Sequence, residues 1–190
     1  MYDMPIFAIT VEISSILSDY YIGRCKGMHT NDPNVQELEQ TIMKYKRTVY
    51  GIAMTQLKNK HEADDVFQEV FLLYFLKKPV FDNENAKRAW LIRTALNKCR
   101  QYNYGKWNSN TDKTFEPPDD RLADFESKYD SEIFDAVRGL PEGLREPLYL
   151  HCFLGLSVNE TASLLGIKAS TASMRLSRAK KILQGKMEGE

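Results

Sequence analysis

The residues best suited to chemistry lie near the C-terminus, where hydroxyls and cations share one predicted helix. Residues 166–187 contain six basic residues and no acid, so they carry a charge of +6. Ser157, followed three residues later by Glu160, has the spacing of a capping box that begins a short helix, and Gly166 suits the turn after it. A short helix, a tight turn and a second helix that can enter a major groove define a helix-turn-helix. The segment therefore predicts binding to duplex DNA.

The last helix is predicted from Ser170 to about Gln184, with a buried side and a DNA-facing side. Its predicted buried residues are Ala172, Leu176, Ala179 and Leu183. The side chains left for the outside are Ser173, Met174, Ser177, Arg178 and Lys181. Small hydroxyls let a helix approach base edges, and arginine binds guanine or phosphate. The alternative is a solvated basic face on a helical hairpin.

A second basic helix is predicted from about Asn85 to Tyr104. Residues 86–107 again hold six basic residues and no acid, a charge of +6. On a helical wheel one face contains Trp90, Arg93, Thr94, Asn97, Arg100, Gln101 and Tyr104. Ile92, Ala95 and Cys99 lie opposite. Aromatic, guanidinium and amide groups together suit the bases and phosphates of single-stranded DNA. The alternative is that Trp90 belongs to the core and the cations are solvated.

The helix before it, predicted over residues 62–76 with Asn59 as its N-terminal cap, has an acidic side. The polar residues assigned to that side are Glu62, Asp64, Asp65, Gln68 and Glu69. Paired carboxylates can serve a catalyst or a metal, but no histidine partner or glycine-rich phosphate loop accompanies them. Two interpretations stay open, a solvated face and a face that docks another protein.

The rest of the chain consists of the elements that must position these faces. Apolar residues spaced by three and four predict another helix from about Val35 to Ile52, and a further helix is predicted over residues 144–153. Residues 109–132 hold eight acids, three cations and Pro117-Pro118, which predicts an extended acidic linker. Residues 1–35 are predicted to be a poorly anchored extension, with β-branched residues 6–13 able to form one strand.

Composition excludes several classes of function. The 190 residues carry no net charge, so the two basic segments are balanced by acidic ones. The three cysteines and three histidines have no metal-ligand spacing, so we predict neither metal nor cofactor, and reduced thiols with a redox switch as the alternative. No stretch approaches the roughly 20 apolar residues of a membrane span. The N-terminal residues lack the basic region of a signal peptide, so we predict a cytoplasmic protein with no direct membrane insertion.

Several motifs together resemble those of a known family. Residues 63–71, ADDVFQEVF, resemble the core-binding signature of sigma-70 family factors, and residues 89–97, AWLIRTALN, resemble the promoter-melting helix that follows it. Leu140-Pro141-Glu142, Glu160-Thr161-Ala162 and residues 171–179, TASMRLSRA, resemble the family's C-terminal region. The resemblance covers residues 36–187 except the linker. Because no middle domain is present, the chain looks like the extracytoplasmic-function (ECF) group.

The resemblance implies an all-α fold with two small helical domains joined by a flexible linker. Sigma region 2, a bundle of three or four helices, would occupy residues 36–108, and sigma region 4, the helix-turn-helix, residues 132–187. Residues 109–131 would be the linker and 1–35 an extension. The implied function is that of an alternative sigma factor, which is not an enzyme and has no small-molecule substrate. It binds bacterial core RNA polymerase and promoter DNA, and an anti-sigma factor is an expectation by resemblance only.

The resemblance also assigns roles by matched position. The polymerase-binding residues would be Asp64, Asp65, Gln68 and Glu69. Residues that contact or melt the single-stranded −10 element would be Trp90, Leu91, Arg93, Asn97, Arg100 and Gln101. Residues at the duplex −35 element would be Ser170, Thr171, Ser173, Met174, Arg175, Ser177, Arg178 and Lys181. The family usually has other residues at Thr161, Ser170 and Ala172, so the preferred promoter sequence stays open.

Two competing hypotheses explain less of the chain. A helix-turn-helix regulator that binds DNA without polymerase accounts for residues 140–187 but leaves the acidic helix and the first basic helix without a role. A nucleic-acid hydrolase requires a nucleophile with its base, or a metal site, and the sequence offers neither constellation.

Overall fold

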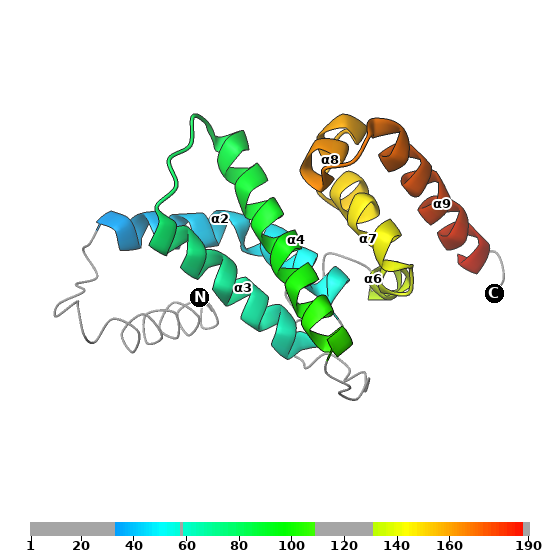
Figure 1. Cartoon of the computed structure of the whole chain (residues 1–190), viewed down its shortest axis with the longest axis horizontal. Helices are drawn as coiled ribbons and strands as arrows, with labels where there is room; N and C mark the ends of the chain where they lie inside the picture. The colour runs from blue at the N-terminus through cyan, green and yellow to red at the C-terminus, as the bar shows by residue number, and fades with distance from the viewer. Residues whose placement is uncertain (1–32, 58, 109–130, 188–190) are drawn as a thin grey trace.

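Every regular element that the structure describes is a helix. The computed structural model describes residues 33–57, 59–108 and 131–187. Within these ranges there is no strand, which agrees with the predicted all-α class (Figure 1). The strand predicted over residues 6–13 and nearly all of the predicted extension and linker lie outside the described residues. The helices form two units, one on each side of Figure 1.

The first unit contains three long helices, α2 (Pro33–Gln56), α3 (Lys60–Lys77) and α4 (Glu84–Asn108). All three pack against one another around a shared apolar core. The rings of Tyr50, Phe67 and Phe71 meet edge to face, with centroids 5.8 and 4.9 Å apart. Such pairs add to the stabilisation from burial. Each helix begins within three residues of its predicted start.

Side-chain caps fix where α3 and α4 begin. The Asn59 side chain accepts a hydrogen bond from the backbone N–H of Glu62 at 2.9 Å, which confirms the predicted cap. Asn83 does the same for the N–H of Ala86, also at 2.9 Å. Both bonds satisfy an N–H that has no partner within its helix. At its other end α3 stops at the left-handed residue Lys78 (φ 43°), ahead of the proline at 79.

The second unit contains α6 (Ser131–Arg138), α7 (Glu142–Leu148), η2 (Tyr149–Phe153), α8 (Val158–Leu165) and α9 (Ala169–Met187). We did not predict α6. The helix predicted over residues 144–153 is present, but its second half, η2, is a π-helix, and α7 holds Pro147 in its interior. The core of this unit joins α6, α7 and α9 through Val137, Leu148 and Leu176.

The turn between α8 and α9 forms as predicted. The Ser157 hydroxyl accepts from the Glu160 backbone N–H at 3.2 Å, and the Glu160 carboxylate accepts from the Ser157 N–H at 2.8 Å. These two bonds form the predicted capping box. Gly166 ends α8 in the left-handed conformation (φ 67°), which glycine adopts without a steric penalty. The chain then turns directly into α9.

The two units pack against each other. The end of α2 contacts α6 and α7, and α4 contacts α8. As a result every residue from 51 to 57 is buried, although an isolated surface helix would expose one face. Tyr149, Leu150 and Leu165 of the second unit join the buried cluster of the first. The interface between the units is therefore a continuous apolar core, which the sequence alone did not predict.

None of the described helices is long and apolar enough to cross a lipid bilayer.

Candidate nucleic-acid and polymerase interfaces

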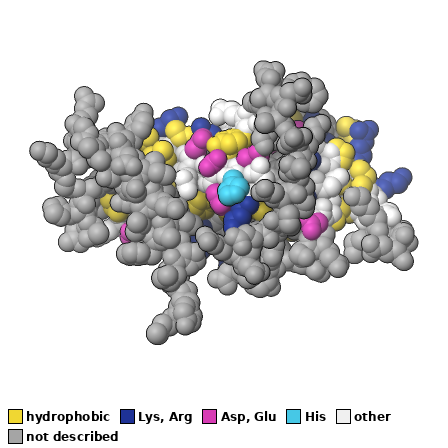
Figure 2. All heavy atoms as spheres, turned by 90° about the horizontal axis from the view of Figure 1, so that it is seen from below, with side chains coloured by type: hydrophobic (Ala, Val, Ile, Leu, Met, Phe, Trp, Pro, Cys, Tyr) yellow, Lys and Arg dark blue, Asp and Glu magenta, His cyan; other side chains and the backbone are white. Residues whose placement is uncertain are grey.

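The outer face of α9 presents most of the residues predicted for duplex DNA to solvent. Its exposed members are Ser170, Ser173, Met174, Ser177, Arg178 and Lys181. Thr171 and Arg175 are half-buried. In Figure 2, Lys and Arg side chains gather at the end of the molecule where α9 lies. Among the described residues, neither Arg178 nor Lys181 forms an ion pair, so both cations are available to a phosphate or a base.

The opposite side of α9 fixes the helix in place. Ala172, Leu176 and Ala179 are buried, and Leu183 packs partly against the same cluster, as predicted. Alanine at 172 and 179 lets the α9 backbone approach its neighbours α7 and α8 closely. The outer face of α9 is therefore held by packing on the far side of the same helix, as a site built on a regular element requires.

The residues of α4 predicted for single-stranded DNA divide into an exposed row and a partly covered one. Arg93, Asn97 and Gln101 are exposed. Trp90 is half-buried against Tyr74 and Phe81, with ring centroids 6.1 Å away in both cases. The Trp90 ring therefore packs against the core of the first unit, as the alternative interpretation expected, and the half-buried side chain keeps some accessible surface, so a contact with DNA stays a prediction.

Leu91 is a correction to the predicted set. Its side chain is 0% exposed and lies in the core of the first unit. The buried stripe of α4 is wider than expected, because Leu91, Ile92, Ala95 and Leu96 are all buried. Helices α2, α3 and α8 cover α4 from more than one side. In this structure Leu91 cannot contact DNA.

Arg100, also in the predicted set, is held by the second unit. Its Nε and one terminal nitrogen donate to the two carboxylate oxygens of Glu146 at 2.9 and 2.8 Å. This bond raises the pKa of Arg100, so the guanidinium stays charged. Nearby, the Asn103 amide donates to Glu142 at 3.0 Å, and Arg88 donates to the Leu154 carbonyl at 2.7 Å.

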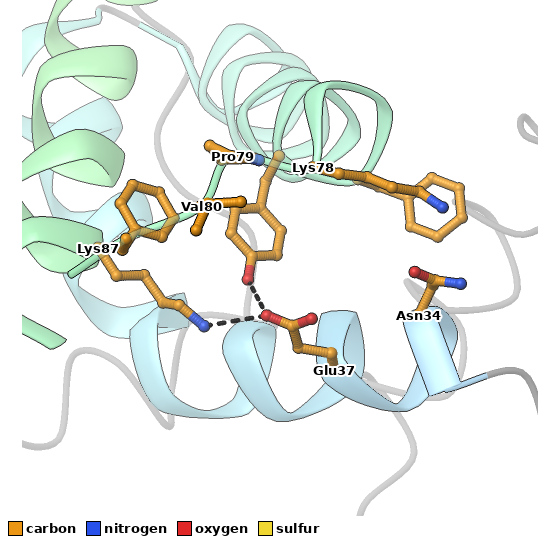
Figure 3. Close-up of a pocket in the computed structure, with 9 residues that line it drawn as sticks. Asn34, Glu37, Lys78, Pro79, Val80 and Lys87 are labelled. Carbon is orange, nitrogen blue, oxygen red and sulfur yellow. Dashed lines mark hydrogen bonds and ion pairs between the residues drawn. The ribbon is translucent and has the colours of Figure 1, made fainter. Parts of the chain in front are cut away.

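A pocket of about 330 Å³ opens beside the loop between α3 and α4. Figure 3 shows that Glu37 of α2 lines one side of the pocket, where its carboxylate accepts hydrogen bonds from Tyr74 at 2.6 Å and from Lys87 at 3.2 Å. These bonds hold the pKa of the Glu37 carboxyl below its usual value. The network ties α2, α3 and α4 together at the loop and seats the Tyr74 ring against Trp90. Sequence reasoning missed this pocket, since its residues come from three separate helices and from the loop between α3 and α4.

The acidic side of α3 is partly exposed and partly occupied. Asp65 is exposed, and Gln68 is half-buried. Burial raises the pKa of Asp64, whose carboxylate is hydrogen-bonded by Tyr50. Glu69 pairs with Lys98 of α4 at 2.6 Å. The surface therefore carries less free negative charge than the sequence indicates.

Glu62 was wrongly assigned to that exposed side. Only 8% of Glu62 is accessible, and its carboxylate accepts a hydrogen bond from the Asn59 amide at 3.0 Å. The carboxylate thus folds back onto the cap of its own helix, where the positive end of the helix dipole also favours it.

The described cysteines differ in environment. Burial raises the pKa of the Cys99 thiol to about 12, so this thiol stays protonated and is a poor nucleophile. Cys152 is exposed. Within the described ranges no group of three or more His, Cys, Asp or Glu side chains is placed to hold a metal ion.

The comparisons with known proteins match both units to one family. Residues 41–107 match the family model described as Sigma-70 region 2, and residues 131–183 match that described as Sigma-70, region 4. Together the two matches cover well over half of the chain. The chain belongs to the sigma-70 family of RNA polymerase sigma factors, and it carries regions 2 and 4 of that family.

The relatives agree with this assignment. The chain is 27% identical over 157 residues to RNA polymerase sigma-H factor of Pseudomonas aeruginosa, which covers 75% of this chain and 81% of the relative. It is 25% identical over 162 residues to the ECF RNA polymerase sigma-E factor of Haemophilus influenzae, covering 77% and 85%. The crystal structure of the sigma factor RpoE with the anti-sigma factor NepR from Bartonella quintana shares the fold. It has a TM-score of 0.64 and 19% identity, and covers 80% of this chain and 98% of that one.

The function follows from the family. The protein is an ECF sigma factor that directs RNA polymerase to promoters, so it binds core polymerase and DNA. Sigma factors are non-catalytic subunits, which agrees with the prediction that the chain is not an enzyme. From here the first unit is called region 2 and the second unit region 4.

Proposed function

We propose that three surfaces of this sigma factor have separate binding roles in transcription initiation. The acidic side of α3 docks core polymerase, the polar face of α4 holds the melted −10 strand, and the outer face of α9 reads the −35 duplex. The main support for the proposal is that positive and negative residues lie on different surfaces. Both nucleic-acid faces come from acid-free basic segments, whereas the docking side of α3 contains no lysine or arginine.

On α9 the proposed −35 residues are the exposed Ser170, Ser173, Met174, Ser177, Arg178 and Lys181, with Thr171 and Arg175 at the edge. Arg178 and Lys181 are one turn apart, and both can reach a phosphate or the guanine acceptors in a major groove. The small side chains of Ser173 and Ser177, which precede them on the helix, leave room for a close approach to DNA. Their spacing of four places both serines on one side of the helix, where base edges would lie.

On α4 the proposed −10 residues are Trp90, Arg93, Asn97, Arg100 and Gln101. Arginine and amide groups bind phosphates and unpaired base edges, and the accessible part of the half-buried Trp90 side chain offers one base an aromatic surface. Leu91 is left out because it is buried. For α3 the proposed polymerase contacts are Asp64, Asp65, Gln68 and Glu69, among which Asp65 is the most accessible.

A sigma factor acts where polymerase and the chromosome are, so we propose a cytoplasmic location. We also propose that an anti-sigma factor controls the protein. The support is indirect: the RpoE structure that shares this fold was solved with an anti-sigma factor.

The test is assembly with core polymerase. Purified protein and bacterial core polymerase are mixed and separated by size exclusion, and the complex is then assayed by run-off transcription. We expect co-elution and promoter-dependent transcripts. Asp65→Asn should weaken co-elution, whereas Glu39→Gln, which removes the same charge from an exposed site on α2, should not. Equal behaviour of the two variants would remove α3 from the docking surface.

A further inference from the structure

Region 4 covers part of the α4 face that would hold the −10 strand. Glu142 and Glu146 lie one turn apart on α7, and Asn103 and Arg100 lie one turn apart on α4. The four side chains pair across the interface, Glu142 with Asn103 at 3.0 Å and Glu146 with Arg100 at 2.8 and 2.9 Å. We call this set of four the α7 clasp.

The Glu146 carboxylate occupies the donors that a DNA phosphate would use. Its two oxygens accept from two nitrogens of one guanidinium, a geometry that arginine also offers to phosphate. The Glu146 carboxylate is 9% exposed, and the Arg100 side chain is 35% exposed. Water therefore screens this pair less than an ion pair fully at the surface. While the clasp is closed, Arg100 cannot bind a phosphate with the same two N–H groups.

Other contacts hold the same interface shut. Arg88 of α4 donates to the Leu154 carbonyl at 2.7 Å, and Arg138 of α6 donates to the Leu57 carbonyl at 3.4 Å. Between them, Tyr149 and Leu150 enter the apolar cluster that includes α4. The clasp is thus the polar border of a packed interface.

This closed arrangement is too short to span a promoter. The −10 and −35 elements lie about 25 base pairs apart, roughly 85 Å at 3.4 Å per base pair. Here α4 contacts α8, which contacts α9. Packed helix axes lie about 8–10 Å apart, so the two reading helices are separated by roughly 20 Å. Regions 2 and 4 must therefore separate before both elements are bound.

We propose that the α7 clasp is an autoinhibitory contact, in which Glu146 and Glu142 of region 4 mask the −10-binding face of region 2 until polymerase holds the regions apart. This inference rests on the role proposed above for α4. Only the open fraction of the free chain can bind single-stranded DNA at this face. The apparent affinity is therefore the intrinsic affinity multiplied by that fraction. Binding to polymerase and release of the clasp are then coupled.

The test compares two variants of the full chain that remove the same charge, Glu146→Gln in the clasp and Glu39→Gln on the exposed side of α2. The probe is a fluorescein-labelled, mixed-sequence single strand of about 20 nucleotides, followed by fluorescence anisotropy. We expect Glu146→Gln to bind about tenfold more tightly than wild type, about 1.4 kcal/mol. Its radius of gyration in small-angle scattering should also increase. Glu142→Gln should show a smaller gain, because Glu142 contacts only Asn103 within the clasp and the glutamine oxygen can still accept that bond.

Two results would overturn the clasp. In the first, Glu146→Gln binds the single strand no more tightly than wild type. In the second, Glu39→Gln shows an equal gain, which would mean that the change in net charge alone causes the effect. Thermal melting checks that each variant is folded. In the assembled holoenzyme, wild type and Glu146→Gln should transcribe alike. If wild-type holoenzyme transcribes but free Glu146→Gln binds the single strand no more tightly, the clasp alone is refuted. If neither holoenzyme gives promoter-dependent transcripts, the proposed roles of the surfaces are refuted.

Discussion

The two basic helices α4 and α9 have similar charge but different surroundings. Each comes from a segment with a charge of +6 and no acid. On α9 the cations Arg178 and Lys181 point to solvent, while on α4 Arg100 and Lys98 are paired with Glu146 and Glu69. By charge alone the two helices are equivalent, but in the structure these two cations of α9 are exposed, whereas these two cations of α4 are paired with carboxylates.

The charge that a basic helix presents to solvent depends on its neighbours as well as on its own residues. Helix α9 lies at the edge of its unit, and only its inner side is covered. Helix α4 lies between the other helices of region 2 and α8 of region 4, so its neighbours supply both apolar cover and counter-charges. Duplex recognition by α9 should thus need less rearrangement than strand capture by α4.

The largest expected effect is on stability, and it distinguishes the buried residues of α4 from those on its polar face. Because Leu91 is fully buried, Leu91→Ala should lower the free energy of unfolding by about 2–5 kcal/mol. Chemical denaturation measures the change. Arg93→Ala, at an exposed site two residues away, should change stability by under about 0.5 kcal/mol. A stable Leu91→Ala variant with weakened DNA binding would return Leu91 to the reading face.

The next effect tests whether α9 reads DNA with one face. Arg178→Ala should weaken binding of the holoenzyme to a promoter duplex by about 1–3 kcal/mol and leave co-elution with core polymerase unchanged. The matched control is Lys180→Ala, which removes an exposed cation of the same helix that lies outside the proposed reading set. Fluorescence anisotropy on one promoter fragment measures both variants. Equal losses would mean a diffuse basic surface instead of a reading face.

Local features of the helices were predictable from the sequence, whereas contacts between distant segments were not. The cap at Asn59, the capping box at Ser157 and the left-handed Gly166 each depend on residues within four positions, so the sequence specifies them. Arg100 and Glu146 are 46 residues apart, and no periodic pattern connects them. The two misplaced residues have different origins. Leu91 was placed by its match to the family motif, and the helices packed around α4 bury it. Glu62 was assigned to the polar side of its helix, but its carboxylate folds back onto the Asn59 cap.

Helix α6 was missed for a related reason. The acidic composition of residues 109–132 predicted a linker up to its first residues, and the helix is only eight residues long. Its apolar residues 133, 134 and 137 do have helical spacing. Short amphipathic helices gain their stability from tertiary packing, here through Val137, so a weak local signal is expected.

Two buried threonines, one in each region, give a smaller contrast. Thr41 of region 2 donates to the Tyr74 hydroxyl at 3.5 Å, whereas the hydroxyl of Thr161 in region 4 is fully buried with no partner among the described residues. A buried hydroxyl without a hydrogen bond costs about 1–3 kcal/mol, so Thr161→Val should raise the free energy of unfolding by about 1 kcal/mol. Thr41→Val should not raise it. A loss of stability in Thr161→Val would indicate that this hydroxyl does have a partner.

The smallest effect concerns the network beside the pocket, which ties α4 to the rest of region 2. The hydrogen bonds from Tyr74 and Lys87 lower the pKa of Glu37 in the folded state below its ordinary 4.5. The carboxylate therefore contributes stability above about pH 4.5, and this contribution disappears as pH falls through the lowered pKa. Because Glu37 is largely exposed, we expect Glu37→Gln to cost only about 0.2–1 kcal/mol at neutral pH. Thermal melts at neutral and acidic pH should show the difference from wild type shrinking on acidification, with Glu39→Gln on the same helix showing none. A pH-independent difference would mean that Glu37 acts through packing, and the ion pair would then contribute nothing to holding α4 in place.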